Sequence, residues 1–152
     1  MQRVITGFHR DDAGDWVAEL SCLHGQHVRH QPPFRAAPWV LDDDERQARI
    51  GTPLDCPLCD RAEMPDGLRL VRSTTTWDQA TLPAALRRRH RIGTGTWGLL
   101  EVLVGRLHFT AETDPPLDRT VDPDRPQAIP PEVAHTVEPV GDVRFLITFL
   151  TR

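Results

Sequence analysis

The sequence predicts a mostly β chain built from two modules, and three patterns in its 152 residues support this. Short stretches of alternating apolar and polar residues recur, and glycine or proline turns separate them. No stretch has the sustained 3.6-residue periodicity of a long amphipathic helix. All three cysteines fall in the first half, whereas the more continuous strand patterns fall in the second. We therefore expect a small module over residues 1–65 and a larger all-β module over residues 70–152.

The composition is that of an ordinary globular protein, with 39% hydrophobic and 26% charged residues. No apolar run approaches the roughly 20 residues that span a bilayer, and the N-terminus lacks the apolar core of a signal peptide. We therefore expect a cytoplasmic protein without a membrane partner. The formal net charge is −4 at pH 7, which argues against binding to the phosphate backbone of a nucleic acid.

The first module is expected to begin with a β-hairpin. Residues 3–10 and 16–22 both alternate, and the cluster DDAGD at residues 11–15 is typical of a turn. The stretch DDDERQARI at residues 42–50 has acidic residues where a helix start favours them. Few aliphatic residues remain to form a core, so a structural metal is a physically reasonable source of stability.

A cluster of thiols and imidazoles supplies ligands for such a metal. It consists of Cys22, His24, His27, His30, Cys56 and Cys59. Zinc prefers four thiolate or imidazole ligands in a tetrahedron, normally as two short chelating pairs. Cys56-x-x-Cys59 is one such pair, and Cys22 completes the other with His24 or His27.

Several alternatives remain open at this stage. His30 could replace either histidine or face a substrate instead. A redox function of the Cys-x-x-Cys pair and a role as plain core cysteines beside surface histidines are the other interpretations. In a reducing compartment an odd number of cysteines favours metal or redox chemistry over disulfides.

The first module also resembles a known family through ITGFHRDDAGDWVAELSC, HGQHVRHQPP, PWV and LDCPLCD. This family consists of short bacterial proteins described as pressure-regulated-protein-like, and the resemblance covers roughly residues 2–60. It implies no established activity. One departure is Leu23, where a glycine is expected between Cys22 and His24.

The second module is expected to be a sandwich or small barrel of short strands. Residues 92–112 indicate two strands that turn at Val104-Gly105, and residues 141–152 indicate a turn and a terminal strand. The proline-rich stretch 114–127 is expected to be a connection. By strand alternation, Trp97, Leu99 and Glu101 share a face.

One motif favours a cupin-like double-stranded β-helix barrel. Pro130-x-Glu132-x-x-His135 matches the later cupin motif Pro-x-Gly-x-x-His except at the glycine, and His90 precedes a Gly-Thr-Trp-Gly turn. The second half resembles the TehB/YeaR-like cupin family through LPAALRRRH, GTWGLLEVLVGRLHF, PPEVAHTVEP and DVRFLITF. That family occurs in tellurite-resistance methyltransferases and in bacterial proteins that respond to nitrogen oxides. The resemblance implies a pocket with His90 and His135 and a possible homodimer.

These features support two hypotheses about function. The first is an accessory binding or sensing protein in metalloid or reactive-nitrogen stress, with zinc in the first module and a second divalent metal or small anion in the cupin pocket. Arg88, Arg89 or Arg91 would supply positive charge there. The second hypothesis is a metal-dependent enzyme of the oxygenase or isomerase type that uses His90 and His135. A carboxylate ligand for it would have to come from Glu101 or Glu138, and both histidines could instead be plain hydrogen-bonded residues of the barrel.

Overall fold

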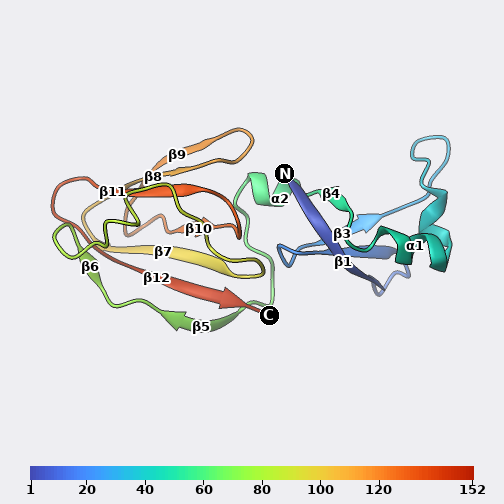
Figure 1. Cartoon of the computed structure of the whole chain (residues 1–152), viewed down its shortest axis with the longest axis horizontal. Coiled ribbons are helices and arrows are strands. Elements are labelled where there is room, and N and C mark those ends of the chain that lie inside the picture. The colour runs from blue at the N-terminus through green and yellow to red at the C-terminus, as the bar shows by residue number, and fades with distance from the viewer. The chain divides into compact units, whose positions relative to one another are not determined.

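The computed structural model describes all 152 residues, and the chain is mostly β-sheet (Figure 1). It divides into two compact units, Met1–Cys56 and Pro57–Arg152. Every pair of strands is antiparallel. None of the helices has the length and apolar character that crossing a membrane requires.

A four-stranded sheet in the order β3-β2-β1-β4 forms the first unit. Its strands are β1 (Gln2–Arg10), β2 (Trp16–Leu20), β3 (Gly25–Val28) and β4 (Pro53–Asp55). The predicted hairpin is present as β1 and β2, and Asp11 stabilises its turn. The Asp11 carboxylate accepts hydrogen bonds from the backbone N–H groups of Ala13 (3.0 Å) and Asp15 (2.9 Å).

Strand β3 was not expected, because its sequence GQHV lacks the alternation of a half-buried strand. Only Val28 of this strand is buried. The strand forms because its backbone pairs with β2, from Trp16 opposite Val28 to Glu19 opposite Gly25. Backbone hydrogen bonding across a sheet edge requires no particular side chains, so the pattern carried no signal for it.

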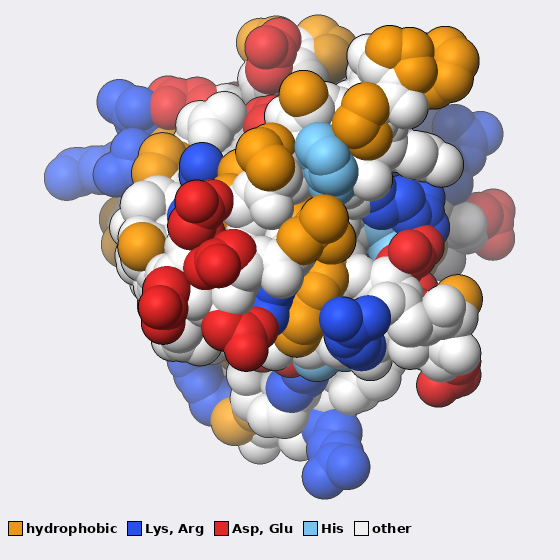
Figure 2. All heavy atoms as spheres, turned by 90° about the vertical axis from the view of Figure 1, so that its right-hand side faces the viewer, with side chains coloured by type: hydrophobic (Ala, Val, Ile, Leu, Met, Phe, Trp, Pro, Cys, Tyr) orange, Lys and Arg blue, Asp and Glu red, His pale blue; other side chains and the backbone are white.

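The helical part of this unit consists of a 3-10 helix, η1 (Pro38–Leu41), and the predicted helix α1 (Asp43–Arg49). The Asp42 side chain caps α1 by accepting a hydrogen bond from the Glu45 backbone N–H at 2.9 Å. Figure 2 looks onto the side of the molecule where α1 lies and shows acidic side chains gathered on one part of this face. The first turn of α1 contains three acidic residues, which the helix dipole favours.

The second unit contains two antiparallel sheets. The larger has the order β10-β7-β12-β5, with β6 also paired to β12, and the smaller has the order β11-β8-β9. The elements are α2 (Pro57–Asp60), β5 (Arg69–Ser73), β6 (Trp77–Asp78), β7 (Trp97–Val104), β8 (Leu107–Ala111), β9 (Leu117–Val121), β10 (Gln127–Ile129), β11 (His135–Pro139) and β12 (Arg144–Thr151).

Two of these strands correct the sequence-based expectation. Strand β9 lies within the proline-rich stretch 114–127, which was expected to be a connection. Its five residues contain no proline and pair with β8 from Leu107 opposite Val121 to Ala111 opposite Leu117. Strand β5 begins at Arg69, between the two expected modules, and its five residues are all exposed, so no burial pattern marks it.

The turn between β7 and β8 lies at Gly105, close to the predicted position. Gly105 has a φ of +82°, which favours glycine. A Cβ atom there would also overlap the carbonyl oxygen of Asp142. The chain therefore needs glycine at this turn for two independent reasons.

The register of β7 and β12 determines which side chains line the core of this unit. Phe145 lies opposite Val102, Ile147 opposite Leu100 and Phe149 opposite Gly98. Because side chains alternate along strands, these residues share one face of the sheet. Leu99 and Glu101, which are only partly buried, lie on the other face together with the fully buried Trp97.

Candidate metal centre and histidine pocket

Four buried side chains of the first constellation lie together: Cys22, His24, Cys56 and Cys59. Their ligand atoms are all within 4.8 Å of one another. The Cys22 Sγ is 3.8 Å from the Cys56 Sγ, and the His24 Nδ1 is 3.5 Å and 3.4 Å from these two sulfurs. None of the three cysteines forms a disulfide.

These spacings match the edges of a metal-centred tetrahedron. With Zn–S bonds of about 2.3 Å and Zn–N bonds of about 2.0 Å, tetrahedral angles place two sulfurs about 3.8 Å apart and a sulfur and a nitrogen about 3.5 Å apart. The S···S distance of 3.8 Å and the S···N distances of 3.4–3.5 Å therefore suit three ligands of one tetrahedral ion, and the Cys59 Sγ lies within 4.8 Å of all three as the fourth. The group can hold a metal ion with one imidazole and three thiolates.

Strand β1 brings the two chelating pairs together, because it pairs with β2 on one side and β4 on the other. The Val4 carbonyl accepts a hydrogen bond from the Ser21 N–H (2.8 Å), next to Cys22. The Met1 carbonyl accepts one from the Cys56 N–H (2.7 Å). Cys22 and Cys56, which are 34 positions apart, therefore lie close together beside the start of β1.

The turn that carries Cys22 and His24 requires an unusual backbone at the residue between them. Leu23 has a φ of 72°, in the left-handed region that favours glycine. The expected glycine at this position is therefore the residue that the geometry favours. The turn conformation is kept despite leucine, since the Leu23 N–H donates to the Leu20 carbonyl (2.7 Å) and the Leu20 N–H to the His24 carbonyl (3.0 Å).

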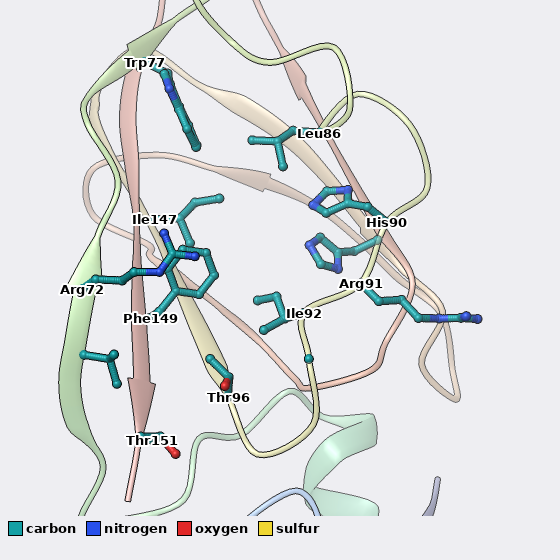
Figure 3. A pocket seen from close by; sticks show the side chains of 13 residues that line it. Arg72, Trp77, Leu86, His90, Arg91, Ile92, Thr96, Ile147, Phe149 and Thr151 are labelled. Atoms are coloured by element: carbon teal, nitrogen blue, oxygen red, sulfur yellow. The ribbon is translucent and has the colours of Figure 1, made fainter.

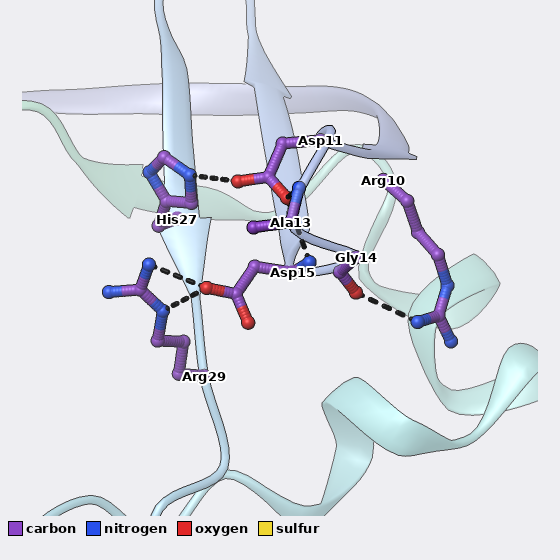
Figure 4. A network of polar contacts seen from close by, with 7 residues as sticks. All are labelled: Arg10, Asp11, Ala13, Gly14, Asp15, His27 and Arg29. Atoms are coloured by element: carbon purple, nitrogen blue, oxygen red, sulfur yellow. Dashed lines mark hydrogen bonds and ion pairs between the residues drawn. The ribbon is translucent and has the colours of Figure 1, made fainter.

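The other two histidines of the constellation lie elsewhere. The His27 ring is 49% exposed, and its Nε2 pairs with Asp11 Oδ2 at 2.7 Å (Figure 4). The His30 Nδ1 accepts a hydrogen bond from the Ala37 backbone N–H at 3.0 Å. Of the alternatives left open by the sequence, the structure brings His24 to the thiols and leaves His27 and His30 outside the group.

The electrostatics of the group favour a bound cation. Burial alone would lower the pKa of His24, but the hydrogen bonds and negative charges of Cys22 and Cys56 raise it to about 9. Thiolates in a buried site stabilise a positive charge beside them. A metal ion would supply this positive charge and contact all four ligands. It would replace the proton on His24, because imidazole coordinates a metal in its neutral form.

A second candidate site is a cavity of about 470 Å³ in the second unit, which we call the histidine pocket. Its lining comes from β5, β6, β11, β12 and the segment 86–96. The lining residues are Val71, Arg72, Trp77, Leu86, His90, Arg91, Ile92, Gly93, Thr96, His135, Ile147, Phe149 and Thr151 (Figure 3). Most of the surface that this wall presents to the cavity is apolar.

The two predicted histidines lie side by side in this pocket. Their ring centroids are 4.1 Å apart, and the rings are inclined at 57°. His90 lies outside any regular strand, yet it forms an antiparallel bridge with His135, the first residue of β11. The Phe109 ring, 5.8 Å from the His135 ring, helps to bury it.

Backbone carbonyls fix the orientation of both rings. The Nδ1 of His90 lies 2.9 Å from the Arg88 carbonyl oxygen, and the Nδ1 of His135 lies 2.9 Å from the Val133 carbonyl oxygen. A carbonyl only accepts, so each Nδ1 carries the hydrogen and each Nε2 of the neutral ring keeps its lone pair. The His135 Nε2 is buried without a hydrogen-bond partner. Burial lowers the pKa of His135 to about 4, so this ring stays neutral near pH 7.

The expected carboxylate ligands lie away from this pocket. Glu101 is on the opposite face of β7 from the core, where its Oε2 accepts a hydrogen bond from Thr148 Oγ1 at 3.0 Å. Glu138 is exposed and lies opposite His108 in the β8–β11 pair. Strand alternation explains both positions. Glu101 directly follows the buried Leu100, and Glu138 directly follows the buried Val137, so both glutamates point to the opposite face of their strands.

The arginines expected to supply positive charge do so only in part. Arg89 pairs with Glu112 at 2.5 Å, Arg88 is exposed, and the Arg91 side chain points away from the pocket in Figure 3. Arg72 of β5 was not singled out from the sequence. Its guanidinium lies over the Phe149 ring, 4.3 Å from the centroid, and extends along the pocket wall. All five residues of β5 are exposed, so the strand lacks the alternation of buried and exposed residues that could have pointed to Arg72 in the sequence.

The fold and these two sites define a β protein in which a Cys/His module precedes a module with a histidine pocket. Residues 72–147, half of the chain, match the model of the TehB-like domain, and the chain therefore belongs to the TehB-like domain family. Residues 6–63 match the model of a protein of unknown function, DUF3565. That description contains no link to pressure regulation.

Two solved structures are similar to this chain. A crystal structure of TehB from Haemophilus influenzae has a TM-score of 0.53 and 26% identity, and the match covers 59% of this chain and 33% of that one. This chain thus corresponds to about a third of the length of that TehB chain. A crystal structure of a protein from E. coli strain K12 has the same TM-score and identity, with 58% of this chain and 94% of that chain covered. The comparison with curated protein sequences gave no match.

Proposed function

We propose that the chain is an accessory binding or sensing protein of the cytoplasm, with structural zinc in residues 1–65 and a metal- or anion-binding cupin-like barrel in residues 70–152. The observation that carries the proposal is that the Cys22, His24, Cys56 and Cys59 ligand atoms lie within 4.8 Å of one another, with tetrahedral spacing among those of Cys22, His24 and Cys56. Three thiolates and one imidazole, all buried, are a ligand set typical of structural zinc.

The cupin-like part of the proposal is supported by two antiparallel sheets and by the pocket. His90 and His135 each carry an available Nε2, and a ring nitrogen fixed by a hydrogen bond at the other nitrogen is typical of metal-binding histidines. Two imidazoles leave coordination positions open for a ligand. The resemblance to tellurite-resistance and nitrogen-oxide-responsive proteins supports a role in metalloid or reactive-nitrogen stress.

A metal-dependent enzyme that uses His90 and His135 is the second candidate, because the same open positions would admit a substrate. The lining of the pocket contains no carboxylate to complete a two-histidine, one-carboxylate site. This absence favours binding over oxygenase chemistry.

The test is a metal inventory combined with growth under stress. Purified full chain should contain about one zinc per molecule, and a divalent metal added in excess should occupy a second site that His90→Ala removes. A strain that lacks the gene should regain tolerance to tellurite or to a nitric oxide donor with the natural chain but not with His90→Ala. Normal tolerance in the deleted strain would contradict the stress function, and zinc-free folded protein would contradict the structural metal.

A further inference from the structure

The chemistry of the histidine pocket restricts what it can hold. The polar side chains that line it are His90, His135, Arg72 and two threonines, whereas the Arg91 side chain points away from it, and no acidic side chain lines it. The remaining wall is apolar and includes Trp77, Leu86, Ile92, Ile147 and Phe149. No carboxylate in the pocket would therefore repel an anionic ligand. A ligand without apolar groups would lose hydrogen bonds to water that the apolar wall cannot replace.

The histidine end of the pocket attracts cations and not anions. Both Nδ1 atoms donate to backbone carbonyls, so the Nε2 atoms present lone pairs. Lone pairs repel a negative group, and the buried Nε2 of His135 lacks any hydrogen-bond partner. A metal ion on the two rings satisfies this nitrogen and converts the same end of the pocket into an anion-binding surface.

A metal held there would keep its full positive charge, because both protein ligands are neutral. An uncompensated divalent ion beside an apolar wall is costly, and an anion supplied by the ligand offsets that cost. Arg72, whose guanidinium lies 4.3 Å from the centre of the Phe149 ring, adds a further positive charge along the wall.

The apolar wall decides between two kinds of anion. A small inorganic oxyanion would lose its hydration against six apolar side chains and gain nothing from them. An organic anion with an apolar body gains about 25 cal/mol per Å² of apolar surface that it buries. A cavity of about 470 Å³ accommodates an aromatic ring with one carboxylate.

We propose that the histidine pocket binds a small organic carboxylate with an apolar body, whose carboxylate completes the coordination of a divalent metal on His90 and His135. The apolar body packs against Ile147 and Phe149, near Arg72. This inference rests on the proposed metal binding at the two histidines and adds the class of ligand and its dependence on the metal.

The experiment uses the zinc-loaded full chain, Ni²⁺ as the added metal and benzoate as the probe, with calorimetry and the fluorescence of the tryptophans as readouts. Acetate lacks the apolar body, benzamide lacks the charge, and tellurite is an inorganic oxyanion. Benzoate should bind at least about tenfold more tightly with Ni²⁺ than without it, and at least about tenfold more tightly than the three other probes. Zinc content is measured in parallel to show that Ni²⁺ leaves the thiol site unchanged.

Variants separate the contributions of the residues. His90→Ala should lose both Ni²⁺ binding and the Ni²⁺-dependent binding of benzoate, whereas His108→Ala, on β8 outside the pocket, should retain both. Arg72→Gln should bind Ni²⁺ normally and benzoate several-fold more weakly. Arg69→Gln is its matched control, because Arg69 is an exposed arginine of the same strand that does not line the pocket.

The outcomes that overturn the inference differ from those that overturn the proposed function. Equal binding of benzoate with and without Ni²⁺, or tighter binding of tellurite than of benzoate, contradicts the inference alone. The inference alone is also contradicted if Ni²⁺ binds through His90 but benzoate does not bind to the Ni²⁺-loaded chain. Failure of Ni²⁺ to bind in the pocket contradicts the proposed metal site and the inference with it.

Discussion

His90 and His135 donate backbone hydrogen bonds to each other, at 3.1 Å and 3.0 Å, and this exchange holds their rings 4.1 Å apart. The bridge joins a segment without regular structure to the first residue of β11. Since backbone atoms alone form the bridge, either side chain can be replaced without removing it. The two rings nevertheless differ in burial, because His135 is only 2% exposed.

This difference predicts unequal costs of removing the two rings. His135→Ala should lower the free energy of unfolding of the second unit by about 1–3 kcal/mol, because it empties a buried position beside Phe109. His90→Ala should cost clearly less, since that ring is only partly buried. Denaturant unfolding in the presence of a chelator measures both, and zinc content should match that of the natural chain. Equal costs would mean that the burial of His135 does not contribute to stability.

Loss of a thiol should unfold the first module. Cys56→Ser or Cys59→Ser removes one of three thiolates, and zinc sites of this kind supply roughly 10 kcal/mol of folding free energy. We expect the variants to lose zinc and the dispersed amide signals of residues 1–55, while the signals of the second unit persist. His27→Ala is the control and should retain zinc, because its ring pairs with Asp11 instead. Zinc-free protein with an ordered first module would contradict the structural metal.

Leu23→Gly should stabilise the metal-binding turn. Leu23 has a φ of 72°, and a left-handed backbone costs a residue with a Cβ about 1–2 kcal/mol. Glycine relieves this strain, but the loss of the contacts made by the half-buried leucine side chain reduces the gain. The free energy of unfolding of the zinc-loaded protein should therefore rise by up to about 1 kcal/mol. Ala13→Gly, in the exposed turn after β1, should lower it slightly. A destabilised Leu23→Gly would show that the leucine side chain outweighs the backbone strain.

Two glycines test the close approach at the β7–β8 turn. Gly105 and Gly141 have φ values of +82° and +73°, but only at Gly105 would a Cβ meet another backbone segment, at Asp142. Gly141→Ala should cost about 1 kcal/mol from backbone strain alone. Gly105→Ala should cost at least about 1–3 kcal/mol more, because the backbone must move. Similar melting temperatures for the two variants would rule out this close approach.

The turn after β6 should become less stable in acid. The Asp78 carboxylate accepts hydrogen bonds from the Thr81 hydroxyl and from the backbone N–H groups of Thr81 and Ala80, and these lower its pKa below 3.8. A lowered folded pKa means that the contribution is present above pH 3.8 and is lost as the pH falls through the folded pKa. Asp78→Ala should therefore be less stable than the natural chain at pH 6, and the difference should shrink below pH 3.8. A difference independent of pH would contradict the role of the carboxylate.

The sequence by itself determined the mostly β character of the chain and the thiols that form the metal group. Alternation along residues 3–10 and 97–104, and the x₂ spacing of Cys56 and Cys59, are local properties that a linear pattern contains. A single motif singled out His135, and the family resemblance implied a pocket with His90 and His135. The resemblance of the first module also placed a glycine at the position of Leu23, which the φ of 72° favours.

Only the tertiary structure decided between His24 and His27, because the choice depends on which ring the β2–β3 turn directs toward the thiols. Strands β3, β5 and β9 likewise form through backbone pairing with a neighbour, and their side chains are largely exposed. The exclusion of Glu101 and the participation of Arg72 follow from the register of β12 against β7 and β5. Register is a relation between distant segments, so no local pattern of side chains contains it.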